Sequence, residues 1–344
     1  MRLVAQGLAG PGASGPTAAV QLLTCVQAQD FPGAAESVAL RADGGDVRAA
    51  LDAGAVVRSW PMRGTLHFTA AEDLGWMLEL TTGRLIRGAA KRRESLDLDL
   101  ADIERARELA VAALSGTQAL RREEMLAVWD TGGVSTAGQR GYHLIWHLSQ
   151  TGTLCWGPMR DGAQALVLLD EWVRTPRRLE RDEALGEWVL RYFLGHGPAT
   201  VKDAARWIGL TAGDVKTGLA HARPRLERIE VDGVEYLMDP ELPDRYLAHR
   251  DQAEAVHVLP GFDEFMLGYG DRSAALPDAF AQRICPGNNG MFRGTVVHDG
   301  QVVGTWKRAG SGRRKRIEAE PFTDFAPAVL DRLGAESQAP ASAR

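Results

Sequence analysis

Residues 56–68 carry the sequence Val-Val-Arg-Ser-Trp-Pro-Met-Arg-Gly-Thr-Leu-His-Phe, in which a break at 61–64 separates two short runs. Apolar or alternating runs on either side of a Pro/Gly break are typical of two strands joined by a turn. Before them, apolar spacing predicts helices at 17–26, 34–40 and 46–51. Helices followed by a hairpin are the order of elements in a winged helix, which is therefore the predicted fold here.

The same order returns twice, at unequal spacing. The second copy has helical patterns from Ile103 to about Gln150 and a hairpin at 154–169, turned by Asp161-Gly162. The third has a helix at 184–194, two short helices and a hairpin at 226–238. The two short helices are opened by the capping sequences Thr200-x-x-Asp203 and Thr211-x-x-Asp214 and are separated by Gly209.

The remaining chain differs, because short strands around Gly-rich turns predict a small barrel followed by a closing helix at 324–333. The predicted fold is α+β, with three tandem winged-helix (helix-turn-helix) domains and a small C-terminal β-barrel. The predicted domains are residues 1–98, 99–178 and 179–249 for the winged helices, 250–334 for the barrel and 335–344 for a disordered tail.

Composition excludes several classes of protein. The chain has 344 residues with a net charge of −5, so a DNA-binding protein of this composition must gather its basic residues on one face. Cys25, Cys155 and Cys285 lack any C-x-x-C spacing, and His143 and His147 have no neighbouring third ligand, so neither metal nor cofactor is predicted. No signal peptide or membrane span is evident, which predicts a cytoplasmic, nucleoid-associated protein.

Gln27 and Gln29 form the first candidate site. They precede Pro32, which cannot continue a helix, so the backbone is expected to become extended near Phe31. In an extended segment, residues two apart share a face, and two neutral amides could hold a water or a sugar. The alternative is two solvated glutamines at a frayed helix end.

The candidate DNA-binding residues fall into three groups. Arg63, Thr65 and His67 alternate along one strand, where the alternative is an ordinary exposed strand face. Arg140 and His143, on a helix of the second unit, are of types that reach base edges or phosphates, although that helix also carries many apolar residues. Basic residues near the C-terminus resemble a phosphate-tracking surface. These are Lys307, Arg308, Arg313, Arg314, Lys315 and Arg316.

Several motifs, spread from end to end and in the family's order, resemble the AlkZ-like winged-helix DNA glycosylases (the AlkZ/YcaQ family). They are Arg2-Leu3-Val4-Ala5-Gln6-Gly7-Leu8, Val26-Gln27-Ala28-Gln29, Trp60-Pro61-Met62-Arg63-Gly64-Thr65-Leu66-His67, Leu259-Pro260-Gly261-Phe262-Asp263-Glu264-Phe265-Met266-Leu267-Gly268-Tyr269 and Asp299-Gly300-x-Val302-Val303-Gly304-Thr305-Trp306. The resemblance implies a basic concave channel formed by the winged helices and barrel. It also implies excision of N7-alkylated purines from double-stranded DNA, including bulky adducts and crosslinks made by natural products. Gln27-Ala28-Gln29 matches the family's Gln-apolar-Gln catalytic motif, which implies that Gln27 and Gln29 are catalytic in a monomeric, monofunctional enzyme.

The implied chemistry suits two amides. An N7-alkylguanine is already cationic, so its glycosidic bond breaks toward a neutral base and an oxocarbenium-like sugar. Little acid catalysis is needed, and the enzyme mainly supplies a positioned water and favourable electrostatics. Two alternatives stay open: a non-catalytic winged-helix transcriptional regulator reading bases with Arg140 and His143, and a structural sensor of DNA lesions.

Overall fold

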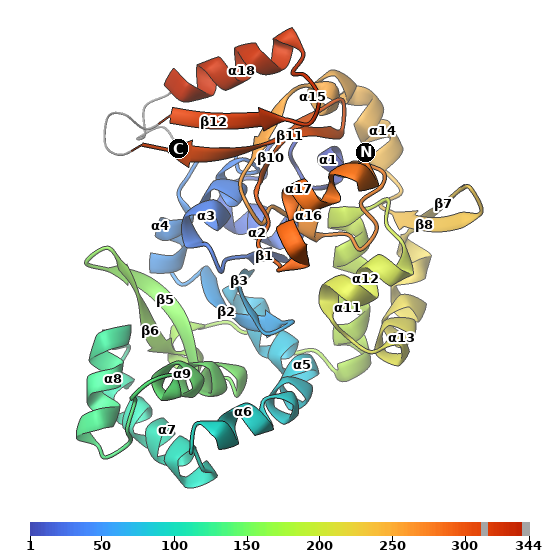
Figure 1. Cartoon of the computed structure of the whole chain (residues 1–344). Helices are drawn as coiled ribbons and strands as arrows, with labels where there is room; N and C mark the ends of the chain where they lie inside the picture. The colour runs from blue at the N-terminus through green and yellow to red at the C-terminus, as the bar shows by residue number, and fades with distance from the viewer. Residues whose placement is uncertain (311–315, 339–344) are drawn as a thin grey trace.

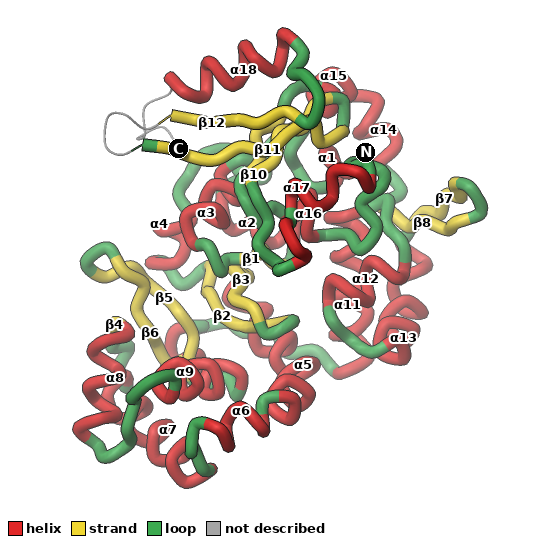
Figure 2. Tube along the Cα trace, viewed as in Figure 1, coloured by secondary structure: helices red, strands yellow, loops and turns green. Residues whose placement is uncertain are grey.

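The computed structural model describes residues 1–310 and 316–338 and shows a mixed α/β protein (Figure 1). Its paired strands form three antiparallel sheets, and each of the three predicted hairpins is present. Figure 2 shows the third hairpin projecting away from the other strands. None of the helices within these described ranges is long and apolar enough to cross a membrane.

The first hairpin consists of β2 (Val56–Met62) and β3 (Thr65–Ala70). Its turn is Arg63-Gly64, where both residues have positive φ, 54° and 72°. Two consecutive residues with positive φ match the right-handed twist of the flanking strands, and glycine accepts this conformation without strain. The predicted strand–turn–strand is confirmed.

The first two hairpins share one sheet. Its strand order is β1-β3-β2-β5-β6-β4, and β2 meets β5 where Arg58 pairs with Trp156. Residues far apart in the sequence therefore stabilise one another directly. The further strands are β1 (Cys25–Gln27), β4 (Leu120–Arg121), β5 (Leu154–Arg160) and β6 (Ala163–Leu168).

The first predicted helix is shorter than expected. α2 (Pro16–Leu23) ends at Thr24, whose φ is 67°, and the chain continues as β1. Pro32 does not stop this helix; it lies in the first turn of α3 (Phe31–Ala39), where a missing N–H costs no helical hydrogen bond. The prediction that the backbone becomes extended near Phe31 is therefore wrong about the position, because the extended segment begins at Cys25.

Helices surround the six-stranded sheet. The helices of the first two units, besides α2 and α3, have the following bounds. They are α1 (Arg2–Ala5), α4 (Val47–Asp52), α5 (Leu74–Gly88), α6 (Ala90–Ser95), α7 (Leu100–Leu114), α8 (Arg122–Thr131), α9 (Arg140–Gln150) and α10 (Leu169–Trp172). Short 3-10 turns lie at Ala71–Asp73, Arg223–Arg225, Asp278–Phe280 and Pro286–Asn288.

The third unit follows its predicted capping signals. Thr200 and Thr211 each accept a hydrogen bond from the backbone N–H three residues on, at 3.1 Å, and Gly209 between the two helices is left-handed. A side-chain acceptor at this position satisfies a free N–H of the first turn. The elements are α11 (Arg181–His196), α12 (Val201–Ile208), α13 (Ala212–Ala222), β7 (Glu227–Val231) and β8 (Val234–Met238).

The C-terminal part holds a further sheet, and no closed barrel is detected among the described residues. Its order is β12-β11-β10-β9, and within the described residues no pairing joins β9 to β12. α18 covers one face through Val329 and Leu333, so a helix buries the apolar surface of the sheet. The elements are α14 (Leu242–Ala248), α15 (Arg250–Glu254), β9 (His257–Leu259), α16 (Glu264–Leu267), α17 (Ala281–Ile284), β10 (Gly294–His298), β11 (Gln301–Ala309), β12 (Arg316–Pro321) and α18 (Pro327–Gln338).

The extent of α18 shows that part of the predicted disordered tail is helical. Its helical backbone runs to Gln338, so residues 335–338, predicted to be disordered, are helical. Residues 339–344 lie outside the described part of the chain.

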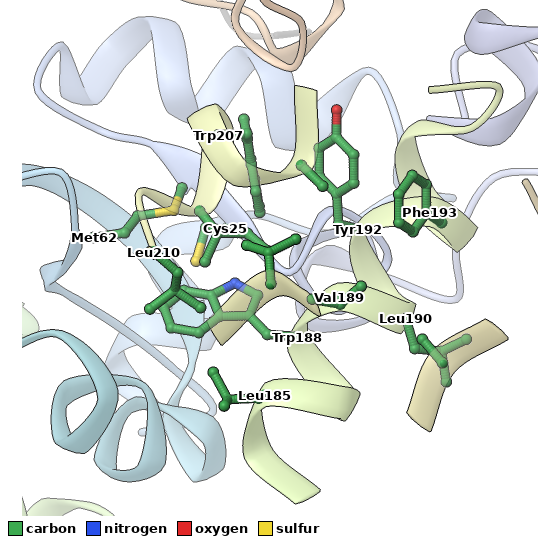
Figure 3. Close-up of a cluster of buried hydrophobic side chains, with 14 of the residues drawn as sticks. Cys25, Met62, Leu185, Trp188, Val189, Leu190, Tyr192, Phe193, Trp207 and Leu210 are labelled. Carbon is green, nitrogen blue, oxygen red and sulfur yellow. The ribbon is translucent and has the colours of Figure 1, made fainter. Parts of the chain in front are cut away.

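One buried cluster joins the third unit to the first. Trp188 and Tyr192 of α11 and Trp207 of α12 pack in the same cluster as Cys25 of β1 and Met62 of β2 (Figure 3). Burying large aromatic side chains removes much apolar surface from water, which stabilises the junction. The backbone at Cys25, two residues before Gln27, is thereby fixed from both sides.

Candidate active site around Gln27

The two candidate glutamines lie at the end of β1 and just beyond it. Val26 and Ala28 are buried, whereas Gln27 is half-buried and Gln29 is exposed. Gln29 lies in a bend after the strand, so extended backbone accounts for the orientation of Gln27 only. Because Gln27 belongs to a paired strand opposite His67, the alternative of a frayed helix end is wrong for it.

The two amides retain free hydrogen-bonding capacity. The Oε1 atom of Gln29 accepts a hydrogen bond from the backbone N–H of Leu66, at 3.4 Å. The side-chain amide of Gln27 makes no hydrogen bond with any residue that the structure describes. Each amide can both donate and accept, so together they can hold a water or a sugar hydroxyl.

His67 lies inside the protein, beside Gln27, its partner in the pairing of β1 with β3. Its side chain is fully buried; Nδ1 is 2.8 Å from the Thr65 carbonyl oxygen, and Nε2 is 3.2 Å from Nη2 of Arg63. Burial, together with the nearby Arg63 charge, lowers the pKa of His67 to about 3, so the ring is neutral at ordinary pH. A neutral ring donates from Nδ1 to Thr65 and accepts from Arg63.

The prediction of a DNA-binding strand face is therefore wrong for His67. Thr65 also has a buried hydroxyl oxygen without a partner among the described residues, whereas Arg63 is half-buried. The Arg63 guanidinium lies 6.0 Å from the ring of Trp207. Burial lowers the pKa of Arg63, and the charge of Glu264 partly offsets this effect. Arg63 thus connects the first hairpin to α12.

Sequence reasoning missed Glu264, a fully buried carboxylate beside β1. Its Oε2 accepts a hydrogen bond from Trp207 Nε1 at 2.7 Å, and its Oε1 accepts from the Gln27 backbone N–H at 3.4 Å. The motif from Leu259 to Tyr269 contained the signal, because charged residues are almost never fully buried without partners. Sequence spacing alone could not place it beside a strand more than 200 residues away.

Arg140 and His143 do not form a base-reading surface. Arg140 makes contacts within the protein: it donates to carbonyl oxygens of Ser135, Leu96 and Asp97 and pairs with Asp102 at 3.0 Å. These bonds hold the segment before α7 onto α9. His143 is buried, 5% exposed, and packs against Trp146. The prediction of DNA contacts from these residues is wrong, because the apolar residues of α9 turn it into a core helix.

The basic residues of β11 and β12 are exposed but paired. Lys307 and Arg316 approach the carboxylate of Glu318 at 3.4 and 2.5 Å, and Arg308 pairs with Glu36 at 2.7 Å. Surface pairs of this kind exchange partners at little cost. The other predicted basic residues, Arg313, Arg314 and Lys315, lie outside the described residues.

A groove of about 790 Å³ lies between these strands and the segment after Gln29. Its lining includes Arg293, Lys307, Arg308 and Trp306, together with the carboxylates Asp30, Glu318 and Glu320. The Arg308 guanidinium lies 5.0 Å from the ring of Trp306. The basic and aromatic groups of this groove suit a nucleic-acid strand, whereas its carboxylates oppose phosphate binding.

A second basic surface, which we call the α5–α6 strip, consists of Arg84, Arg87, Lys91 and Arg92. All four are exposed, and none pairs with a carboxylate among residues 1–310 and 316–338. Arg84 donates instead to the carbonyl oxygen of Gly209. Unpaired basic groups gathered on an acidic protein are what phosphate binding requires. The sequence shows this cluster, but its location beside α12 comes only from the fold.

No residue set suggests a metal centre in the part of the chain that is described: it contains no group of three or more His, Cys, Asp and Glu side chains suited to a metal ion. His143 and His147 have ring centroids 6.4 Å apart, and burial lowers the pKa of both.

Comparisons with known proteins agree with this architecture. The family model described as DNA glycosylase AlkZ-like matches residues 20–342. A Streptomyces sahachiroi protein named interstrand DNA cross-link repair glycosylase is 27% identical over 302 residues, which cover 82% of this chain and 79% of that protein. The solved structure of Streptomyces sahachiroi DNA glycosylase AlkZ has a TM-score of 0.77 at 22% identity, covers 98% of this chain and 96% of that one, and therefore shares its fold. The chain belongs to the DNA glycosylase AlkZ-like family.

Proposed function

We propose that this protein is a monofunctional DNA glycosylase that removes N7-alkylated purines, including bulky adducts and interstrand crosslinks. The observation that carries the proposal is that Gln27 lies in a strand fixed by the core and Gln29 follows two residues later, both with side-chain amides that keep free hydrogen-bonding capacity. Family membership and the name of the Streptomyces relative support the reaction class. The proposed organisation is three winged-helix units with the C-terminal sheet around the DNA.

The reaction breaks the bond between C1′ and N9 of the cationic nucleotide. The bonding electron pair passes to the purine, which leaves as a neutral base, while positive charge develops on the sugar. Water held by Gln27 and Gln29 adds its oxygen to C1′, and its proton passes to solvent. The amides supply position and oriented dipoles rather than a base, which is sufficient because the leaving group is already activated.

A lyase step would require an amine nucleophile attached to the sugar. No lysine contacts Gln27 or Gln29 among the described residues, which supports hydrolysis alone. For DNA binding, we assign phosphate contacts to the α5–α6 strip and to Lys307, Arg308, Arg313, Arg314, Lys315 and Arg316. Arg63 is kept as a proposed DNA contact because part of this half-buried residue is exposed to solvent. The regulator hypothesis is weaker, because Arg140 and His143 are engaged or buried.

The test is incubation with duplex DNA that carries N7-methylguanine or a bulky N7 adduct, scored for abasic sites. The proposal predicts release of the modified base from one or both substrates and no strand cleavage before alkali treatment. The unmodified duplex is the control. Absence of release from both modified substrates, with DNA binding intact, would favour a non-catalytic DNA-binding protein.

A further inference from the structure

Gln27 lies on an edge strand, and its backbone N–H points away from the sheet. The neighbouring Ala28 N–H donates to the Leu66 carbonyl oxygen at 2.8 Å, toward β3. N–H groups of successive residues point to opposite sides of a strand, so the Gln27 N–H faces the open edge of β1. Glu264 Oε1 occupies that side, 3.4 Å from the Gln27 nitrogen.

Glu264 itself is held firmly. Its Oε2 accepts from Trp207, and its backbone carbonyl oxygen accepts from Gln6 Nε2 at 3.2 Å. The preceding Asp263 caps α16 and forms a fully buried ion pair with Arg41. A side chain fixed by its own contacts can fix a neighbouring group to within the tolerance that catalysis requires.

The carboxylate of Glu264 is negatively charged in this environment. Burial alone would raise the pKa of Glu264, but the nearby His196 ring, at 3.6 Å, the charge of Arg63 and the hydrogen bond from Trp207 outweigh burial and lower it. Arg63 balances part of the charge. The part of the Glu264 charge that Arg63 does not balance acts electrostatically through a water-poor interior, where screening is weak.

We propose that Glu264 is a positioning residue of this reaction, which holds Gln27 by its backbone N–H and places a fixed negative charge behind it. This inference rests on the proposed function. Gln27 and Gln29 are neutral, whereas the sugar becomes positive as the base leaves, so a carboxylate behind Gln27 orients the amide that faces the sugar and favours the cationic transition state. The carboxylate acts through Gln27 and does not touch the substrate.

The test compares Glu264→Gln with Asp203→Asn. In Glu264→Gln the carbonyl oxygen still accepts from Trp207, so the new NH₂ group faces the Gln27 N–H and cannot accept from it. Asp203 is a matched control, because it is a buried carboxylate that accepts from the Thr200 N–H at the start of α12 and from the Gly270 N–H at 2.8 Å, without contact to Gln27. Two quantities are measured for each protein. One is the single-turnover excision rate on N7-methylguanine duplex, and the other is the hydrogen-exchange rate of the Gln27 backbone N–H.

Glu264→Gln is expected to lower the excision rate at least about tenfold and to speed hydrogen exchange of the Gln27 backbone N–H. The dissociation constant for DNA should stay unchanged. Asp203→Asn is expected to change neither quantity. If Glu264→Gln does not fold, Trp207→Phe loosens the same carboxylate without adding a polar atom to the core, and the same measurements apply.

The outcomes separate this inference from the proposed function. A wild-type excision rate in Glu264→Gln, or an unchanged Gln27 exchange rate, overturns the positioning role while the glycosylase function stands. Equal loss of rate in Asp203→Asn also overturns it, because the effect would then be general destabilisation. A wild-type protein that excises nothing overturns the proposed function, and the role of Glu264 in that reaction falls with it.

Discussion

Arg41 and Asp263 form a two-bond ion pair inside the protein, with Nη1 to Oδ2 and Nη2 to Oδ1 both at 2.8 Å. Both side chains are essentially inaccessible to solvent. The remaining Arg41 donors reach Gln6 and Ser37, so the guanidinium is fully hydrogen-bonded. The pair joins the segment directly after α3 to α16, where Asp263 precedes Glu264, and so fixes the backbone on which Glu264 is placed.

The first prediction concerns this pair. Arg41→Ala should lower the free energy of unfolding by about 3–5 kcal/mol, because it leaves the Asp263 charge buried without its partner. Arg48→Ala is the control: its pair with Asp46 is exposed, and its loss should cost less than about 1 kcal/mol. Urea unfolding measures both. Equal, small losses would show that the buried pair contributes little.

The second prediction concerns acid stability. The pKa of His67 is about 3 in the folded protein and 6.5 when unfolded, so the unfolded chain takes up a proton first as pH falls. Stability should therefore be full above pH 6.5 and decline by about 1.4 kcal/mol per pH unit below it, toward pH 3. Asp263 adds a separate loss at lower pH, because its depressed pKa gives stability that is present above its unfolded value and disappears as pH falls through the folded one.

His67→Asn removes the pH-dependent contribution of His67 to stability and leaves that of Asp263. The variant should be less stable at pH 7, but its free energy of unfolding should fall less steeply between pH 6 and pH 4.5. Urea unfolding over this pH series measures the slope. Parallel curves for the two proteins would mean that His67 is not buried in its neutral form.

The third prediction concerns DNA binding. Arg87→Gln with Lys91→Gln should weaken binding to every sequence and reduce the slope of log K against log salt by about two, since each phosphate contact contributes about 0.9. Arg105→Gln with Arg250→Gln is the control, because both arginines are exposed but paired with Glu108 and Glu254. An unchanged slope in the first pair would remove the α5–α6 strip from the DNA contacts.

Local signals in the sequence predicted much of the fold. The Arg63-Gly64 turn and the Thr200 and Thr211 caps depend on residues close in sequence, and all three are as expected. The shared six-stranded sheet and the C-terminal sheet depend on pairing between distant strands, which local patterns do not specify.

The candidate site was only partly predictable for the same reason. The place of Gln27 follows from extended backbone, but Gln29 lies beyond the strand, and Glu264 reaches Gln27 through tertiary packing. His67 was expected on an exposed face because polar residues alternate along its strand. That strand lies between β1 and β2 and is buried on both faces, so alternation does not mark exposure there.

The central claim is that Gln27 and Gln29 carry out excision, and single-turnover kinetics on N7-methylguanine duplex test it most directly. Gln27→Ala and Gln29→Ala should each lower the rate by about a hundredfold or more, the usual effect of removing one group that acts in the transition state. Gln118→Ala, at an exposed glutamine away from the site, should leave the rate unchanged. DNA binding and thermal stability should stay close to wild type in all three. Wild-type excision rates in both Gln27→Ala and Gln29→Ala would contradict the account.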